Sequence, residues 1–179
     1  MERTRKCALK DGRTMVVRPA SPDDSSAVID TVRSNAMERS YVLMEHYGKD
    51  VASEKAYIAG MNSSKELLVV ADVDNEVVGC LAALQADGGR RPETAHTAKV
   101  GLHIREQFRG VGIGPYLLEY CIAWGREHGF KKLEANIFTT NQRSLNLFKK
   151  SGFVEEGVRQ NRIHVGGMFI SEVLMGKVL

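Results

Sequence analysis

A glycine-rich turn at residues 109–114, with the sequence RGVGIG, constrains the fold of this chain most strongly. A helical pattern begins directly after it, near Pro115. The first turn of a helix leaves N–H groups without internal acceptors, and the helix dipole adds positive potential at the same end. Glycine reaches positive φ and, without a Cβ, lets a ligand approach the main chain. The segment therefore predicts a turn that binds a phosphate or pyrophosphate at a helix N-terminus.

Two common phosphate-binding signatures do not fit this turn. A P-loop requires Lys followed by Ser or Thr after its last glycine, and no such pair follows here. A dinucleotide fingerprint requires G-x-G-x-x-G at the first strand of a domain, whereas Gly110, Gly112 and Gly114 alternate and lie beyond position 100. The pattern that the turn does match is R-x-x-G-x-G, formed by Arg109, Gly112 and Gly114.

A second block at residues 141–153, NQRSLNLFKKSGF, predicts a short capped helix. Asn141 is a typical N-cap residue, and Gly152 suits the left-handed position that ends a helix. On its own such a pattern is also typical of an ordinary surface helix. The buried stripe of this helix is expected to consist of Leu145, Leu147 and Phe148.

The two blocks, in this order and spacing, resemble the GNAT-type N-acetyltransferase superfamily. In that family R-x-x-G-x-G is the turn that holds the pyrophosphate of acetyl-coenzyme A (acetyl-CoA). The second block is similar to the family's N-x-x-[AS]-x-x-L-[YF]-x-K-x-G-F helix. The resemblance extends over about residues 16–179 and is sharpest over 102–153. It implies an α/β fold with one mixed, mostly antiparallel sheet flanked by helices, in which a central pair of parallel strands splays apart.

The resemblance also implies a reaction. An acetyl group would move from acetyl-CoA to the primary amine of a small molecule or an amino acid, by direct attack in a ternary complex. The alternatives are acetylation of peptide or protein N-termini or of lysines, and a non-catalytic acyl-CoA sensor. A nucleic-acid or ribosome-associated binder has little support, because the net charge is only +3 and the arginines are scattered.

The family pattern carries the cofactor-binding positions onto this sequence. Main-chain groups of residues 102–104 would hold the pantetheine between the splayed strands, 94–104 and 132–138. The N–H groups of residues 109–114 would hold the pyrophosphate, and two side chains of the second block would face the pantetheine. The implied acetyl-CoA-binding residues are Leu102, His103, Ile104, Arg109, Gly110, Val111, Gly112, Ile113, Gly114, Asn141, Ser144, Leu147, Phe148 (near the sulfur) and Lys150 (near the adenosine).

Two departures from the family pattern leave the proton transfers open. Phe148 stands where a tyrosine often protonates the leaving thiolate, and Lys99 stands where many relatives have a glutamate. The candidate catalytic residues are Glu134, on the second splayed strand, and His103, whose ordinary pKa suits neutral pH. Glu134 can equally be read as a solvated strand residue, and a lone strand histidine such as His103 is more often exposed at the surface. Further candidates for the base are His96, Glu38 and Glu45.

Hydrophobic periodicity and turn residues predict the order of the elements. Residues 86–92 are expected to form a solvent loop, and residues 39–47 a lid over the amine. The chain is predicted to be one domain, 1–179, in which 1–13 form an N-terminal extension or hairpin strand and about 14–179 form the core. Hairpins are expected about 11–12, 74–75 and 165–167, and helices about 21–37, 52–61, 115–128 and from 141.

Composition indicates the size of the core, the state of the cysteines and the expected cellular location. With 179 residues, 43% of them hydrophobic, the chain can bury one good core. Cys7, Cys80 and Cys121 lie far apart without zinc-like spacing, so we expect reduced thiols, no metal and a cytoplasmic location. No stretch reaches the ~20 apolar residues of a membrane helix, and no signal-peptide pattern is present. From the resemblance we expect a homodimer with a small-molecule amine as partner, and neither nucleic acid nor membrane.

Overall fold

An eight-stranded sheet organises residues 4–38 and 48–179, the part of the chain that the computed structural model describes. Its strand order is β1-β2-β3-β4-β5-β6-β8-β7, and every neighbouring pair is antiparallel except β5–β6. This confirms the expected mixed, mostly antiparallel sheet with a central parallel pair. The strands are β1 (Arg5–Ala8), β2 (Thr14–Pro19), β3 (Glu66–Val73), β4 (Glu76–Gln85), β5 (Thr97–Ile104), β6 (Lys132–Phe138), β7 (Val154–Val165) and β8 (Met168–Val178).

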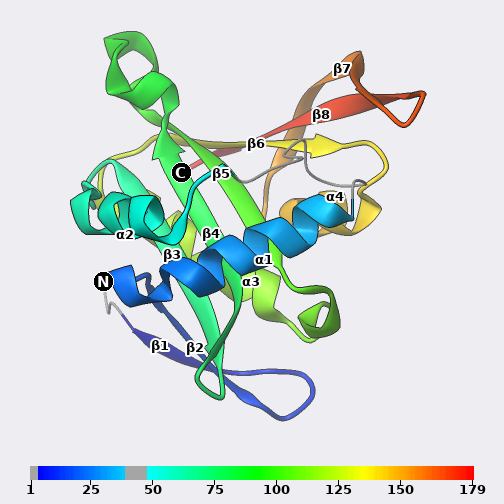
Figure 1. The fold of residues 1–179 in the computed structure, drawn as a ribbon. Helices are drawn as coiled ribbons and strands as arrows, with labels where there is room; N and C mark the ends of the chain where they lie inside the picture. The colour runs from blue at the N-terminus through cyan, green and yellow to red at the C-terminus, as the bar shows by residue number, and fades with distance from the viewer. Residues whose placement is uncertain (1–3, 39–47) are drawn as a thin grey trace.

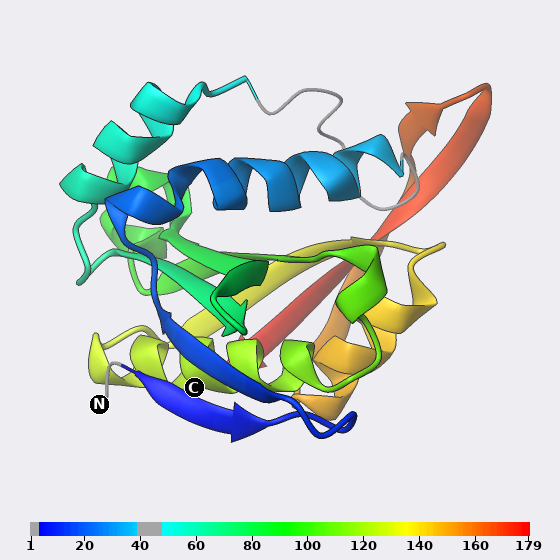
Figure 2. The ribbon, with the colours of Figure 1, turned by 60° about the horizontal axis from the view of Figure 1, so that its bottom comes forward.

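The α-helices of the described residues cover both faces of the sheet (Figures 1 and 2). Figure 2 shows α1 (Ser25–Met37) and α2 (Val51–Gly60) above the sheet. Helices α3 (Ile113–Glu127) and α4 (Gln142–Lys150) lie below it. Helix α1 packs mainly on β4 and β5, while the β7–β8 hairpin projects past its end.

Side-chain caps fix where α2 and α4 begin, whereas before α1 the Asp24 carboxylate closes a short 3-10 turn by accepting the Ser21 N–H at 2.7 Å. Asp50 accepts the Ser53 N–H at 2.7 Å at the start of α2. Asn141, the expected N-cap of α4, accepts the Ser144 N–H at 3.0 Å. Because each cap satisfies an N–H that has no acceptor within the helix, the local sequence determines these boundaries.

Two apolar clusters hold the layers together. The larger one lies between the sheet and α3 and α4, and it includes Leu117, Leu118 and Trp124 from α3. The smaller one joins α1 and α2 to β3 and β4, through residues such as Val32, Ile58 and Cys80. Because all three cysteines are free thiols, no disulfide supports this packing in the described part of the chain.

The observed elements differ from the sequence expectation mainly before β5. Residues 86–92 were expected to form a loop and β5 to begin near residue 94, but two short 3-10 helices, Ala86–Gly89 and Pro92–Thr94, occupy this region. Positive φ angles at Asp87 (52°) and Gly88 (62°) bend the chain into them. The hairpins about 11–12, 74–75 and 165–167 form as expected. The lid expected over 39–47 lies outside the described residues.

Candidate active site

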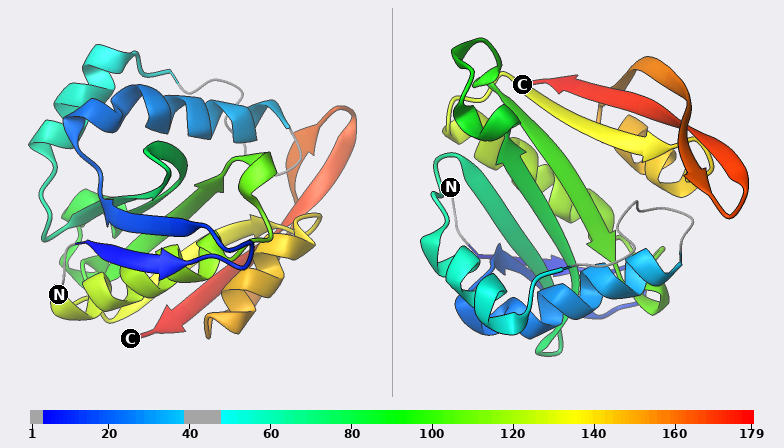
Figure 3. Two further views of the ribbon diagram at one scale, coloured as in Figure 1. Left: turned by 90° about the horizontal axis from the view of Figure 1, so that it is seen from below. Right: turned by 45° about the horizontal axis from the view of Figure 1, so that its top comes forward.

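Strands β5 and β6 pair only at their first rows and then diverge, as the right panel of Figure 3 shows. Beyond the last shared row, β5 continues to Ile104 and β6 to Phe138, each still paired with its outer neighbour, β4 or β8. The expected splay is therefore present, and main-chain groups of both strands face the gap. The shared rows are Thr97 with Lys132, Ala98 with Leu133, and Lys99 with Glu134.

The glycine turn connects the end of β5 to α3. Gly110 and Gly112 have φ angles of 87° and 108°, and α3 begins at the next residue, Ile113. A residue with a Cβ would be strained at both positions, so glycine is required by the backbone itself. The tip of the β1–β2 hairpin supports the turn, because the Lys10 N–H donates to the Val111 carbonyl at 2.9 Å. The N–H groups of the first turn of α3 are thereby held ready for an anion.

Gly114 has a different role from the other two glycines. A Cβ at Gly114 would lie 2.7 Å from Cδ2 of Leu147 on α4, closer than real Cβ contacts come. The residue is buried within α3 and has an ordinary helical conformation. This glycine therefore lets α3 and α4 approach each other, which joins the two sequence blocks in space.

The side chain of Arg109 ties the turn to α1. Its guanidinium donates to the Glu38 carboxylate (Nη1 to Oε2, 2.7 Å), to the Asn35 amide oxygen (3.0 Å) and to the Ile104 carbonyl (2.9 Å). The arginine of the R-x-x-G-x-G pattern thus has a structural role here. Glu38, one of the candidate bases, is already engaged in this ion pair.

Two cationic side chains near the turn were missed by sequence reasoning. A Cβ added at Gly110 would lie 3.2 Å from Nη2 of Arg143, in the first turn of α4. The equivalent position at Gly112 lies 3.8 Å from Cγ of Lys10. Only the fold brings Lys10 and Arg143 to the turn, so sequence spacing carries no signal for them. Together with the free N–H groups, these cations suit a pyrophosphate.

The peptide groups of β5 alternate between its two neighbours. The Arg105 N–H donates to the Val78 carbonyl on the β4 side at 3.0 Å. In an antiparallel ladder every second residue bonds to the same partner strand, so the main-chain groups of His103 also face β4. Those of Leu102 and Ile104 face the gap, where the Ile104 carbonyl accepts from Asn35 and Arg109. Of residues 102–104, Leu102 and Ile104 therefore have peptide groups directed into the splay.

The predicted residues of α4 divide between surface and core. Asn141 and Ser144 are half-exposed at the helix N-terminus, and Lys150 is exposed. Leu147 is half-buried and packs against the larger cluster. Phe148 is 2% exposed and packs edge-to-face on Phe153, with ring centroids 4.9 Å apart. The ring at the usual tyrosine position is thus held by the core.

His103 lies on the face of β5 that α1 covers, opposite Cys80 of β4. Burial lowers the pKa of its imidazole to about 4, so the side chain is neutral at pH 7. Its Nδ1 is buried and has no hydrogen-bond partner among the described residues. A neutral imidazole can accept a proton, but one with so low a pKa is a weak base.

Glu134 lies beside the point where the strands separate. Its neighbours Leu133 and Ala135 belong to the core on the α3 side, so Glu134 projects from the opposite face, which is open here. The Glu134 side chain is 32% exposed, and its Oε1 lies 3.3 Å from Nζ of Lys132. Lys99 is exposed on the same face of the same row.

The remaining candidate proton-transfer residues lie away from the gap between β5 and β6 or outside the described residues. His96 is exposed at the closed end of the parallel pair, where its carbonyl accepts the N–H groups of Lys131 and Lys132. Glu45 lies outside the described residues. The tyrosines of α3 have packing roles, since Tyr120 is 1% exposed and the Tyr116 hydroxyl donates to the Ala8 carbonyl at 3.3 Å.

Neither a metal centre nor a membrane-spanning helix is found in the described ranges. No group of three or more His, Cys, Asp or Glu side chains there is close enough to hold a metal ion. Within the same residues, no helix is both long and apolar enough to cross a bilayer.

Comparison with known proteins identifies the family. The profile of the "Acetyltransferase (GNAT) family" matches residues 33–153, which include β5, the glycine turn and α4. "Putative phosphinothricin acetyltransferase YwnH" of Bacillus subtilis is 29% identical over 165 residues, covering 92% of this chain and 99% of that protein. "L-amino acid N-acetyltransferase AaaT" of Escherichia coli is 27% identical over 114 residues, covering 62% and 67%.

Solved structures agree on the fold. The acetyltransferase yncA of Salmonella typhimurium, described "with its cofactor Acetyl-CoA", superposes with a TM-score of 0.84. Its sequence is 18% identical, and the match covers 92% of this chain and 94% of that one. At this identity the likeness shows a shared architecture.

Proposed function

The chain belongs to the GNAT acetyltransferase family, and we propose on that premise that it acetylates the primary amine of a small molecule or an amino acid, with acetyl-CoA as donor. The observation that carries the proposal is the glycine turn standing at the mouth of the β5–β6 splay. The names of YwnH and AaaT, which specify phosphinothricin and L-amino acids, support an acceptor of this size.

Acetyl-CoA would lie along the glycine turn on its α3 side, and its pantetheine would extend into the gap between β5 and β6. N–H groups of residues 110–114 would bind the pyrophosphate, aided by Arg143 and Lys10, whereas the Arg109 N–H already donates to the Glu106 carbonyl at 3.1 Å. Leu102 and Ile104 have peptide groups directed toward a pantetheine in the gap, with Asn141 and Ser144 on α4 at its rim. We leave the main chain of His103 out of this set because it faces β4. Acetyl-CoA supplies the thioester from which the acetyl group is transferred.

The acceptor would approach from the face that carries Glu134. The amine nitrogen attacks the thioester carbonyl carbon, a C–N bond forms, and the C–S bond breaks. Glu134 is our choice for the base that takes the ammonium proton, directly or through one water, because its carboxylate stands at the last shared row of the splay. His103 is the second choice, since burial keeps it neutral but weakly basic.

The leaving thiolate has no acid at the usual helix position. Phe148 has no proton to donate and lies in the core against Phe153. A thiol with a pKa of ~8.5 is a fair leaving group without help, so CoA would depart as the thiolate and take its proton from water.

Substitution of Glu134 by Gln tests the role of the base. We expect kcat/KM for the acceptor to fall about 100-fold, the usual size for loss of a general base, while acetyl-CoA affinity stays unchanged. Lys132 still has Glu156 as an ion-pair partner at 2.8 Å in this variant, so the fold should be retained. An unaltered pH–rate profile in Glu134→Gln would transfer the role to another group, with His103→Gln as the next variant to measure.

Mass spectrometry of the products tests the activity itself. Purified protein would be incubated with acetyl-CoA and separate panels of amino acids, polyamines, aminoglycosides and short peptides. We expect N-acetylated products from small amines. Acetylation confined to peptides would favour the N-terminal or lysine acetyltransferase alternative, and tight acetyl-CoA binding without any product would favour the sensor.

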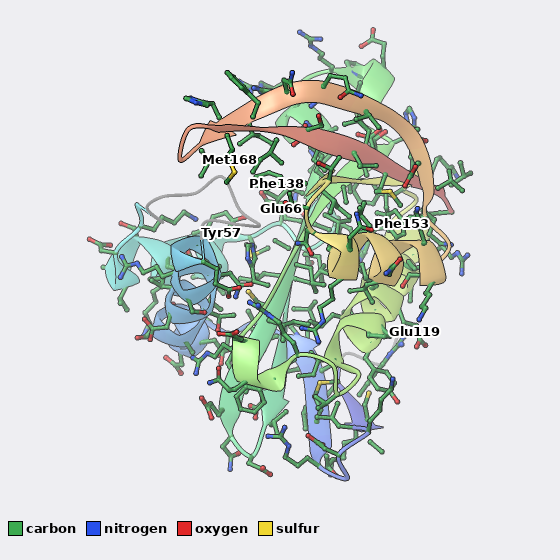
Figure 4. The ribbon with its side chains drawn as sticks, turned by 90° about the vertical axis from the view of Figure 1, so that its right-hand side faces the viewer. Tyr57, Glu66, Glu119, Phe138, Phe153 and Met168 are labelled. Carbon is green, nitrogen blue, oxygen red and sulfur yellow. The ribbon has the colours of Figure 1, made fainter. Side chains whose placement is uncertain are left out.

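We also propose a homodimer in the cytoplasm, through the exposed β7–β8 edge of the sheet. Apolar side chains are exposed along this edge, where Figure 4 shows Met168 at the hairpin tip. Light scattering would give the mass in solution, and a strict monomer at high concentration would contradict the dimer. The exposed apolar residues are Val154 (62%), Val158 (45%), Met168 (65%) and Phe169 (66%).

A further inference from the structure

Lys99 presents an ammonium group on the open face of the central sheet. Ala98 and Val100, on either side of it in β5, belong to the core against α3, so Lys99 projects from the opposite face. It is exposed there, and its neighbour across β4, Leu84, is 39% exposed as well. Within residues 4–38 and 48–179, Lys99 forms no ion pair. A lysine without a counter-charge in a central strand is not explained by packing.

Glu134 lies next to Lys99 with the opposite charge. The two residues form the last shared row of β5 and β6, and adjacent strands in a sheet are about 4.8 Å apart. The two head groups are nevertheless not joined, because Glu134 bonds to Lys132, which it shares with Glu156. One cationic and one anionic group thus stand side by side at the apex of the splay.

We propose that Lys99 and Glu134 together recognise the zwitterion of a free α-amino acid. The α-carboxylate of the acceptor binds Lys99, and its amino group is directed to Glu134, at the place where the thioester must be attacked. This inference rests on the proposed acetyl transfer and narrows its acceptor class. A free amino acid carries one anionic and one cationic group on the same carbon atom, which matches the neighbouring Lys99 and Glu134 in sign.

The same pair disfavours other amines. A polyamine carries a second ammonium group that Lys99 would repel, and a peptide N-terminus has no carboxylate at its first residue. Selectivity therefore comes from attraction of one group and rejection of another. Lys99 is the specificity-determining residue in this arrangement, and Glu134 holds the reacting nitrogen.

Matched substrates allow the charge of the acceptor to be tested alone. The probes are the standard L-amino acids and phosphinothricin, each compared with its α-carboxamide, which keeps the amine and loses the carboxylate. In the wild-type enzyme we expect kcat/KM for the acid to exceed that for the amide by about tenfold or more, the size expected for one hydrogen bond to a charged group. The variant Lys99→Met should remove this difference by raising the KM of the acid, with little change for the amide.

Two measurements separate recognition from folding. Acetyl-CoA affinity should be the same in Lys99→Met and in the wild type, because the turn and the gap are untouched. Lys6→Met is the matched control, since Lys6 is an exposed lysine on β1 at the far edge of the sheet. Its kinetics should equal those of the wild type.

Each other outcome overturns the inference. Equal losses for acid and amide in Lys99→Met, or equal wild-type rates for both, would mean that Lys99 does not bind the carboxylate, while acetyl transfer itself would stand. Absence of turnover with every amine would instead remove the proposed function, and this inference with it.

Discussion

The two faces of strand β5 differ sharply, although they come from the same eight residues, Thr97–Ile104. The face toward α3 is apolar and packed, with Ala98, Val100 and Leu102 contributing to the core. The other face carries Lys99 and Gly101, both exposed, and a half-buried His103 that is neutral at pH 7. The packed face can be understood from pattern and packing alone. The open face bears charged side chains that packing does not require. These side chains can therefore determine which acceptor amine binds.

The largest effect is expected at Gly112, in the turn that follows β5. Substitution of Gly112 by Asp adds a negative charge and a side chain at the turn, so we expect acetyl-CoA affinity to fall at least about 100-fold. The φ of 108° strains any residue with a Cβ, so some stability should be lost. The fold should nevertheless persist, because the added Cβ clashes with nothing and has Lys10 Cγ at 3.8 Å as its nearest neighbour. Calorimetric titration with acetyl-CoA, together with circular dichroism, measures both quantities.

Gly112→Ala is the control for this substitution. It imposes the same strain at a φ of 108° without the charge. If Gly112→Asp binds acetyl-CoA as well as Gly112→Ala does, the turn is not the pyrophosphate site. The assignment of donor and acceptor to different places around β5 would then fail.

An effect of similar size, but on stability, is expected from the pH dependence of His103 on the other face of β5. Burial lowers its folded-state pKa to about 4, whereas the unfolded chain titrates near 6.5. Between these values only the unfolded state binds the proton, so stability is complete above pH 6.5 and falls as the pH drops toward 4. The loss should be on the order of 3 kcal/mol.

Urea unfolding at several pH values checks this expectation, with His103→Gln as the comparison. The variant should lack the part of the acid destabilisation that belongs to His103. Parallel curves for both proteins between pH 4 and 7 would show that His103 is not buried as a neutral group.

The smallest effect is expected for Phe148→Tyr, which restores the usual family residue. The new hydroxyl enters a core position next to Phe153, so stability should fall by about 1 kcal/mol. Acetyl-CoA affinity should stay within about twofold of the wild type. A large loss of affinity would mean that this ring contacts the donor more closely than its burial indicates.

Much of the fold could be predicted from short-range signals. The Ser21–Asp24 turn before α1, the cap at Asn141, the Asp74–Asn75 turn and the alternation in β5 are local features, and local chemistry determines them. The splay followed from the family resemblance, and the end of the ladder at Lys99–Glu134 confirms it. The glycine turn was recognised because only a few backbone conformations can present several N–H groups together.

Other parts of the site could not be predicted, because they depend on contacts distant in sequence. The Arg109–Glu38 pair joins the glycine turn to α1, and Arg143 reaches Gly110 from α4. The burial of His103 depends on packing against α1, a helix that lies far earlier in the sequence. Gly114 was interpreted as part of the ligand turn, and its close contact with Leu147 adds a role in helix packing that depends on a residue distant in sequence.

Amide chemical-shift mapping of the labelled protein tests the central claim most directly. Titration with acetyl-CoA should shift the N–H signals of residues 109–114, Leu102, Ile104 and Ser144. A following titration with the preferred amino acid should shift signals around Lys99 and Glu134. Two separate sets of shifts, one in the glycine turn and along the β5–β6 gap and one on the open face of β5, are the predicted result. Absence of acetyl-CoA binding, or acetyl-CoA shifts that avoid the glycine turn, would contradict the account.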